Sequence, residues 1–210
     1  MVDVKSISRK ERAAITKRAI VSAATEEFRA NGYHGTTMAA IAKRAGVAVQ
    51  TVYFVFHTKP LLLTAAIDNA VVGETDPVPP EMTPWWQDGT TTADGRRAIE
   101  LFVSSVAVIE QRAAALDRVA VQAATTDPEV EEVRGHHEQL RVAGFRSYVD
   151  TFVSRGLLRA GLDAAEATDV LLTLAGSSVF LDFTEGRGWS LERYVAWTTD
   201  ALCSLLLENS

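Results

Sequence analysis

Residues 41–56, IAKRAGVAVQTVYFVF, limit the possible folds of this chain more than any other stretch. The second half is rich in β-branched and aromatic residues, which are typical of strands. The first half resembles the end of a helix that is capped by Gly46. As a strand, the second half would have two mainly apolar faces, and the sequence offers no neighbouring strand to pair with it. As a helix, it places Val52 and Phe56 on an inner face and Gln50 on the outer face, so the helical interpretation is favoured.

Two short helices joined at Gly46 satisfy the packing rules of a helix-turn-helix. Ala42, four residues before the glycine, is small enough for a second helix to cross closely. Gly46 can adopt the positive φ that a short turn between steeply crossed helices requires. The small core of such a motif would be formed by Ile41, Ala45, Val47, Val52 and Val55. The sequence therefore predicts a helix-turn-helix, a unit that binds duplex DNA.

The basic residues are concentrated near the N-terminus. The net charge of the whole chain is −6, which by itself argues against a nucleic-acid partner. Residues 1–60, however, carry ten Lys or Arg and four Asp or Glu, whereas the other 150 residues carry eleven and twenty-three. A basic head on an acidic body suggests that the head meets phosphates and the body has another task.

Helical patterns cover most of the remaining sequence, so we expect an all-α fold. Thr36 or Thr37, Thr58, Asp127, Asp163 and Ser190 can cap helices. Residues 73–93 hold four of the six prolines and are predicted to be a loop. The first four predicted helices are residues 9–31, a short helix that ends at Ala45, another after Gly46, and residues 59 to about 72. The others span about 94–112, 114–126, 128–157, 164–184 and 191–208. We divide the chain into an N-terminal three-helix DNA-binding domain, residues 1–60, and a C-terminal helical ligand-binding and dimerisation domain, residues 61–210.

The stretch AIVSAATEEFRANGYHGTTMAAIAKRAGVAVQTVYFVFHTKPLLL resembles the N-terminal DNA-binding domain of the tetracycline-repressor (TetR) family of transcription factors. Two positions depart from the family pattern. Ala48 stands where the family often has a capping Ser, and Gln50 stands where it usually has Gly. The matching residues are Ile20, Ala23, Ala24, Phe28, Gly32, Tyr33, Thr36, Thr37, Ile41, Ala42, Ala45, Gly46, Val47, Thr51, Tyr53, Phe56, Lys59, Leu61 and Leu62.

The resemblance implies two kinds of DNA contact. Val49, Gln50 and Thr51 would read bases, with the Gln50 amide able to bind adenine through two hydrogen bonds. Other residues would hold phosphates. The alternative is that Tyr53 and His57 are ordinary surface residues and that Lys59 is a solvated charge. The predicted DNA-binding residues are Thr37, Lys43, Arg44, Val49, Gln50, Thr51, Tyr53, His57 and Lys59.

The last two predicted helices are candidates for a homodimer interface. They are apolar on too many sides for surface helices, and residues 175–177 are small enough for close approach. The alternative is a core buried within one chain. The predicted interface residues are Leu171, Leu174, Ala175, Val179, Tyr194, Trp197, Thr198, Ala201 and Leu205.

The resemblance also implies a pocket for a small-molecule effector between the head and the dimer helices. Trp85 and Trp86 would form its lid. The alternative is that these residues are simply core residues. The predicted lining residues are Trp85, Trp86, Phe102, Val106, Leu116, Phe145, Tyr148 and Phe152.

Motifs of other protein classes are missing from the sequence. We find no glycine-rich phosphate loop and no nucleophile motif, so we expect neither an enzyme nor a cofactor. His136 and His137 are adjacent, a spacing that does not suit a metal site. Cys203 is expected to be a buried, inert thiol. No apolar run reaches about 18 residues and no secretory signal is visible, so we expect a cytoplasmic protein without a membrane partner.

The sequence thus predicts a ligand-responsive transcriptional regulator, most simply a repressor. It would bind a pseudo-palindromic operator in double-stranded DNA as a homodimer and be released by a small, largely apolar effector. The helix at about residues 60–72 would act as the hinge between head and body. The alternative is a helical small-molecule-binding protein that does not bind DNA.

Overall fold

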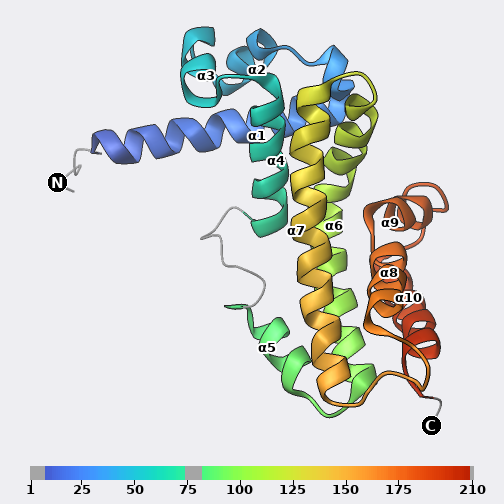
Figure 1. Cartoon of the computed structure of the whole chain (residues 1–210). Helices are drawn as coiled ribbons and strands as arrows, with labels where there is room; N and C mark the ends of the chain where they lie inside the picture. The colour runs from blue at the N-terminus through green and yellow to red at the C-terminus, as the bar shows by residue number, and fades with distance from the viewer. Residues whose placement is uncertain (1–7, 74–81, 209–210) are drawn as a thin grey trace.

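The computed structural model describes residues 8–73 and 82–208, and every regular element in them is a helix. The all-α prediction is therefore confirmed. The helices are α1 Arg9–Gly35, α2 Met38–Ala45, α3 Val49–Phe56, α4 Lys59–Val72, α5 Pro84–Thr91, α6 Gly95–Ala124, α7 Pro128–Ser154, α8 Ala164–Leu174, α9 Ser177–Thr184 and α10 Leu191–Leu206. Helices α1 to α3 form a head at one end of the long α6–α7 pair, while α8 to α10 pack along one side of that pair (Figure 1).

The helix-turn-helix forms as the sequence predicts. α2 ends at Gly46, which adopts the left-handed conformation with φ 69°. α3 follows after two residues and is helical in spite of its strand-like composition. Its Val52 and Phe56 are buried in the head, so tertiary packing overrides the local preference. Gly32, with φ 65°, interrupts α1 near the predicted end, and one further turn follows it.

α4 connects the head to the body and packs against α1, α6 and α7. It begins as predicted, with the Thr58 side chain accepting a hydrogen bond from the Leu61 amide. The buried core of the head continues through α4 into the end of α6 and the start of α7, as far as Val130. Because this core crosses residue 60, the head and the body share α4, and the predicted boundary between two domains remains a prediction.

Two predictions about the first part of the body are wrong. Residues 95–124 form one 30-residue helix, α6, and not two helices with a break near residue 113. The sequence there holds three alanines, residues 113–115, which favour helix continuation. The predicted loop 73–93 contains α5, whose Trp86 is buried against the body. The rest of that predicted loop, residues 74–81, lies outside the described residues.

The predicted helix 164–184 is divided into α8 and α9 at Ala175 and Gly176. A Cβ atom at Gly176 would lie 2.5 Å from the Leu172 carbonyl oxygen and 3.1 Å from an Arg141 nitrogen, so only glycine fits this break. The small residues 175–177 therefore form a turn between α8 and α9. Residues 164–184 together are long and apolar enough to cross a membrane, but the break makes two short helices of them.

α7 and α10 form close to their predicted residue ranges. α7 ends at Ser154 and not at residue 157, because Gly156 adopts φ 64° and its amide bonds to the Val153 carbonyl. α10 carries Cys203, which is half-buried, and burial raises the pKa of its thiol. The thiol is thus less enclosed than predicted but is still held in its unreactive protonated form.

α6 contributes to all three buried clusters of the protein and carries a buried acid in its middle. Glu110 is 6% exposed, and its Oε2 atom has no hydrogen-bond partner. Burial raises the pKa of Glu110 from 4.5 to about 7, and this effect outweighs the opposite effects of the nearby Ser177 hydroxyl and the Arg141 charge. The Glu110 carboxyl therefore binds its proton more tightly in the folded protein than in the unfolded chain.

We predict that Glu110→Gln makes the protein more stable in alkaline solution. The stabilising contribution of protonated Glu110 is complete below pH 4.5 and is lost as the pH rises through 7, at a cost of about 3 kcal/mol. Urea unfolding from pH 5 to pH 8 should show the variant's advantage growing with pH. The exposed Glu132→Gln is the matched control. Equal pH dependence in all three proteins would contradict the assignment.

Candidate nucleic-acid interface

α3 presents one buried face and one exposed face. Val52 is fully buried, whereas Gln50 is exposed and Tyr53 is 51% exposed. Val49 and Thr51 are half-buried beside them. The inner face fixes the helix on the head, so the outer side chains are free to meet another molecule. This division agrees with the helical interpretation of the sequence.

Two further exposed residues lie on the outer face of α3 or at its end. Phe54 is 82% exposed, an unusual position for a phenylalanine. The periodicity of the sequence places it on the outer face, but it is not among the predicted DNA-binding residues. His57 is also exposed, and it follows the last residue of α3 with φ 60°. Phe54 can make an apolar contact to a thymine methyl, so it belongs with the candidate base-contacting residues.

The start of α2 is capped by Thr37. The Thr37 hydroxyl oxygen accepts a hydrogen bond from the Ala40 amide at 3.1 Å, so its own proton remains to be donated. Lys43, in the last turn of the same helix, is exposed. Ala48, at the start of α3, supplies no side-chain cap. The positions of Thr37 and Lys43 are thus compatible with the predicted phosphate contacts, which stay a prediction.

Lys59 and Arg44 take part in the packing of the head, which the sequence does not reveal. The Lys59 ammonium donates to the carbonyl oxygens of Tyr33 at 2.9 Å and Thr36 at 3.2 Å, and burial lowers its pKa. Arg44 donates to Glu26 and Glu27, each at 2.6 Å. A phosphate contact would use the third ammonium proton of Lys59 or the guanidinium N–H groups of Arg44 that do not bond to Glu26 and Glu27.

A hydrogen bond connects the head to the turn between α6 and α7. The Tyr33 hydroxyl donates to Asp127 Oδ2 at 2.8 Å, and the other oxygen of Asp127 caps the start of α7 by accepting from the amides of Glu129 and Val130. This hydroxyl is the main reason that the pKa of Asp127 is lowered. The two partners are 94 residues apart, so the sequence pattern could not pair them.

Comparison with known proteins agrees with this geometry. Residues 20–66 match the family model described as bacterial regulatory proteins of the tetR family. The head is a TetR-family DNA-binding domain. A search of curated proteins finds no match.

Solved structures of TetR-type regulators share the whole fold. NalD, the secondary repressor of the MexAB-OprM multidrug efflux pump in Pseudomonas aeruginosa, is 22% identical with a TM-score of 0.70, and the alignment covers 93% of this chain and 98% of NalD. FadR from Bacillus subtilis, solved in complex with stearoyl-CoA, is 19% identical with a TM-score of 0.70, with 89% and 97% covered. At these identities the likeness shows a common fold.

Behind the TetR-type head, most residues of the predicted effector pocket pack against one another. The Tyr148 ring lies 4.7 Å from that of Phe102 and 5.2 Å from that of Trp86, and the Tyr148 hydroxyl donates to the Ala98 carbonyl at 2.8 Å. Val106, Phe145 and Phe152 share this cluster, and the half-buried Trp85 packs on its edge. Leu116 is not among them, because it lies in the core shared with the head. The Trp pair therefore belongs to a helix that closes an aromatic core.

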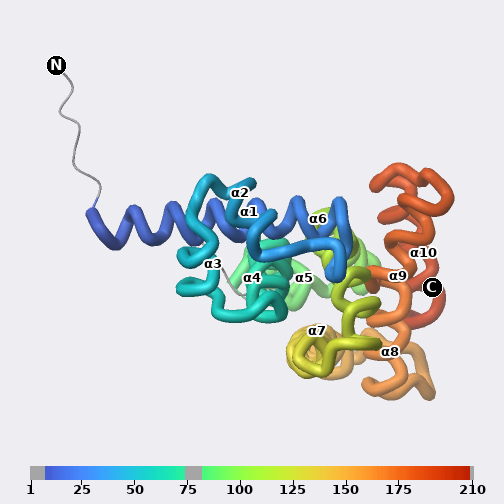
Figure 2. The backbone as a smooth tube through the Cα atoms, turned by 90° about the horizontal axis from the view of Figure 1, so that it is seen from above, coloured from blue at the N-terminus to red at the C-terminus, as the bar shows by residue number. Residues whose placement is uncertain are grey.

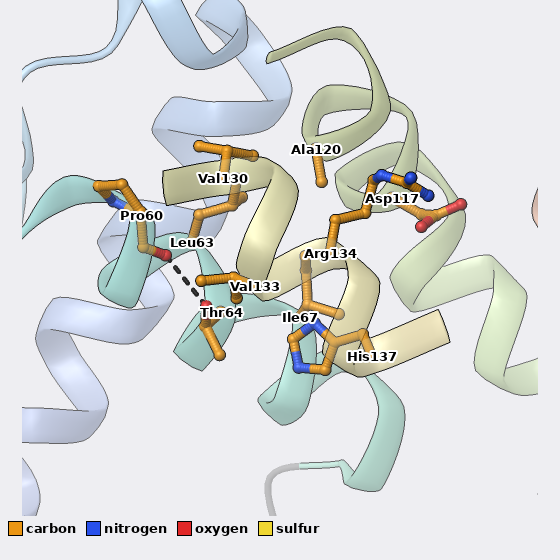
Figure 3. A pocket seen from close by; sticks show the side chains of 10 residues that line it. All are labelled: Pro60, Leu63, Thr64, Ile67, Asp117, Ala120, Val130, Val133, Arg134 and His137. Atoms are coloured by element: carbon orange, nitrogen blue, oxygen red, sulfur yellow. Dashed lines mark hydrogen bonds between the residues drawn. The ribbon is translucent and has the colours of Figure 1, made fainter. Parts of the chain in front are cut away.

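A cavity of about 30 Å³ lies between α4, α6 and α7 (Figure 3). It has room for about one water molecule. Its polar rim includes Asp117, Arg134 and His137, and the His137 Nε2 atom lies 2.9 Å from Asp68 Oδ1 on α4. His137 thus joins the linking helix to the body. Among the described residues, no three His, Cys, Asp or Glu side chains are grouped as a metal ion requires.

The predicted dimer residues divide into two groups. Leu171, Ala175, Tyr194 and Thr198 are buried within the chain, so the internal-core alternative applies to them. Trp197 and Leu205 are 39% and 41% exposed. Leu174, Val179 and Ala201 are half-buried. A partner could contact the exposed and half-buried residues, but not the four buried ones, without rearrangement of the chain.

We predict that Ala48→Ser stabilises the head. Serine can accept a hydrogen bond from an amide in the first turn of α3, which should raise the free energy of unfolding by about 1 kcal/mol. The measurement is urea unfolding of the variant beside Ala48→Val, which has no acceptor. If serine and valine have the same effect, the start of α3 does not lack a cap.

Proposed function

We propose that this protein is a ligand-responsive transcriptional repressor. It binds a pseudo-palindromic operator as a homodimer and is released by a small, largely apolar effector. The observation that carries the proposal is α3, a short helix with a polar and aromatic outer face held on a basic TetR-type head. The transcriptional regulators with the same overall fold support it.

The outer face of α3 supplies chemically distinct groups for the major groove. The Gln50 amide donates and accepts, so it can form two hydrogen bonds to an adenine. Val49 and Phe54 supply apolar contacts for thymine methyl groups, and Thr51 supplies a hydroxyl. The Tyr53 hydroxyl, with Thr37 and Lys43 from α2, would hold phosphates on either side.

The homodimer would form through the exposed apolar residues of α10 and its neighbours. The Trp197 ring lies 4.7 Å from that of Phe183 and 6.0 Å from that of Trp189, and Arg193 covers the Trp189 ring at 4.0 Å. Trp and Arg are the residue types that most often dominate binding energy at interfaces. A dimer is needed because one helix-turn-helix reads only half of an operator.

The effector would enter the aromatic core between α5, α6 and α7 and displace some of its rings. The bound effector would shift α6, and contacts between α6 and the end of α4 would pass this shift to the head. Arg112 on α6 donates to the carbonyl oxygens of Ala70 at 2.8 Å and Val71 at 3.3 Å, and His137 on α7 is held to Asp68. A change in the tilt of α4 alters the separation of the two α3 helices, which must remain near 34 Å to fit successive major grooves.

The decisive experiment isolates binding sites from a pool of random duplexes and compares variants on the selected sequence. Gln50→Ala should weaken binding to this operator by about 1–3 kcal/mol and relax the preference at one base pair of each half-site. Gln139→Ala, an exposed substitution on α7, is the control.

The alternative function, a small-molecule-binding protein without a DNA partner, predicts a different result. It predicts no enrichment of any duplex and no fall in affinity with added salt. Unchanged operator preference in Gln50→Ala would leave DNA binding in place but would contradict the assignment of Gln50 as a base reader.

A further inference from the structure

The first part of α1 contributes no fully buried side chain. From Arg9 to Ala19 the side chains are exposed or, at Thr16 and Ala19, half-buried, and the core begins at Ile20. The N-terminal part of α1 extends past the other head helices on the side where α3 lies (Figures 1 and 2). At 1.5 Å per residue, the exposed part is about 16 Å long.

This projecting part is formed as a regular helix with a complete cap. The Glu11 side chain accepts from the Ser8 amide at 2.7 Å, and the Glu11 amide donates to Ser8 Oγ at 3.2 Å. A free helix of this length would be marginal in water, so it depends on the packed turns that follow. This capped helical extension leaves the side chains of Arg9, Lys10 and Lys17 exposed to another molecule.

The charges of the projecting part are arranged on a defined face. With 100° per residue, Arg9, Lys10 and Lys17 point to the same side of α1 as the buried Ile20 and Phe28 farther along. Arg12 borders this side. The one acid of the segment, Glu11, lies on the opposite side. We call Arg9, Lys10 and Lys17 the basic stripe.

We propose that the basic stripe binds the phosphate backbone of duplex DNA beside the base pairs contacted by α3. The proposal rests on the proposed function. The stripe continues the face by which α1 packs against α2 and α4, so its cations point to the side of α1 on which the helix-turn-helix stands. Duplex DNA carries one negative charge for about every 1.7 Å, which offers several phosphates along the length of the segment.

The test measures the salt dependence of binding to a fluorescent mixed-sequence duplex of about three helical turns. The stripe variant combines Arg9→Gln, Lys10→Gln and Lys17→Gln, which preserve helix propensity. The control combines Arg18→Gln, on the opposite face of α1, with Arg146→Gln and Arg159→Gln on the body. Both variants lose the same net charge, so only position distinguishes them.

The stripe variant should show a slope of log affinity against log salt that is smaller by about 0.9 for each phosphate that the protein no longer neutralises, while the control keeps the wild-type slope. Arg9→Lys should also keep it, because lysine retains the charge. Equal slopes in the stripe variant and the wild type would overturn the inference and leave the proposed function intact. Altered sedimentation of the stripe variant with an unchanged slope would instead assign the stripe to the acidic body of a second copy.

A wild-type protein with no salt-dependent affinity for the duplex would overturn the proposed function itself. Circular dichroism and urea unfolding of both variants establish that they are folded, since the substituted side chains lie outside the core. A stripe variant that is folded and has the control's slope contradicts the inference.

Discussion

The hydrogen bond between Tyr33 and Asp127 ties three parts of the molecule together. Asp127 caps the start of α7, Tyr33 lies in the last turn of α1, and Lys59 at the start of α4 donates to the Tyr33 carbonyl and lies 4.0 Å over its ring. Because the Tyr33 side chain is buried, its hydroxyl would be costly to leave without a partner. The orientation of the head on the body therefore depends on this junction, and so does the direction in which α3 faces.

The composition of α3 follows from the same requirement. A helix of two turns cannot be stable alone and must be held by its inner side chains. Val52 and Phe56 serve this purpose, which leaves Gln50, Tyr53 and Phe54 without a role in the fold. An exposed phenylalanine on a short helix of a basic head is explained by a partner, and the geometry of the helix-turn-helix indicates that the partner is DNA.

Local signals of the sequence were sufficient for the head. Gly46 and Thr58 determine where α2 ends and α4 begins, and both are visible as turn and cap residues. The body is harder to predict, because the break at Gly176 lies where the Leu172 carbonyl and the Arg141 side chain leave no room for a Cβ atom, and Arg141 belongs to another helix. The continuous α6 was missed for a related reason: a run of alanines permits a helix but gives no periodic pattern.

The candidate site shows the same limit. The division of α3 into inner and outer faces could be predicted from periodicity. The partners of Lys59 and Arg44 could not, because Tyr33 and Glu27 come close only after α1 has folded against α2 and α4. The pocket follows from the family resemblance and the interface residues from apolar composition, and neither distinguishes a packed core such as that around Tyr148 from a surface that binds a partner.

We propose that the body of a homodimer places two copies of α3 at the separation of successive major grooves. Spin labels at Ala30→Cys, an exposed position on α1 outside the DNA-contacting residues, report the separation of the two heads by pulsed electron resonance in a Cys203→Ser background. With a selected operator duplex bound, we expect a single narrow distance between the two labels, set by a separation of about 34 Å between the two α3 helices. The absence of any distance between copies, or a broad distribution that the duplex leaves unchanged, would contradict the account.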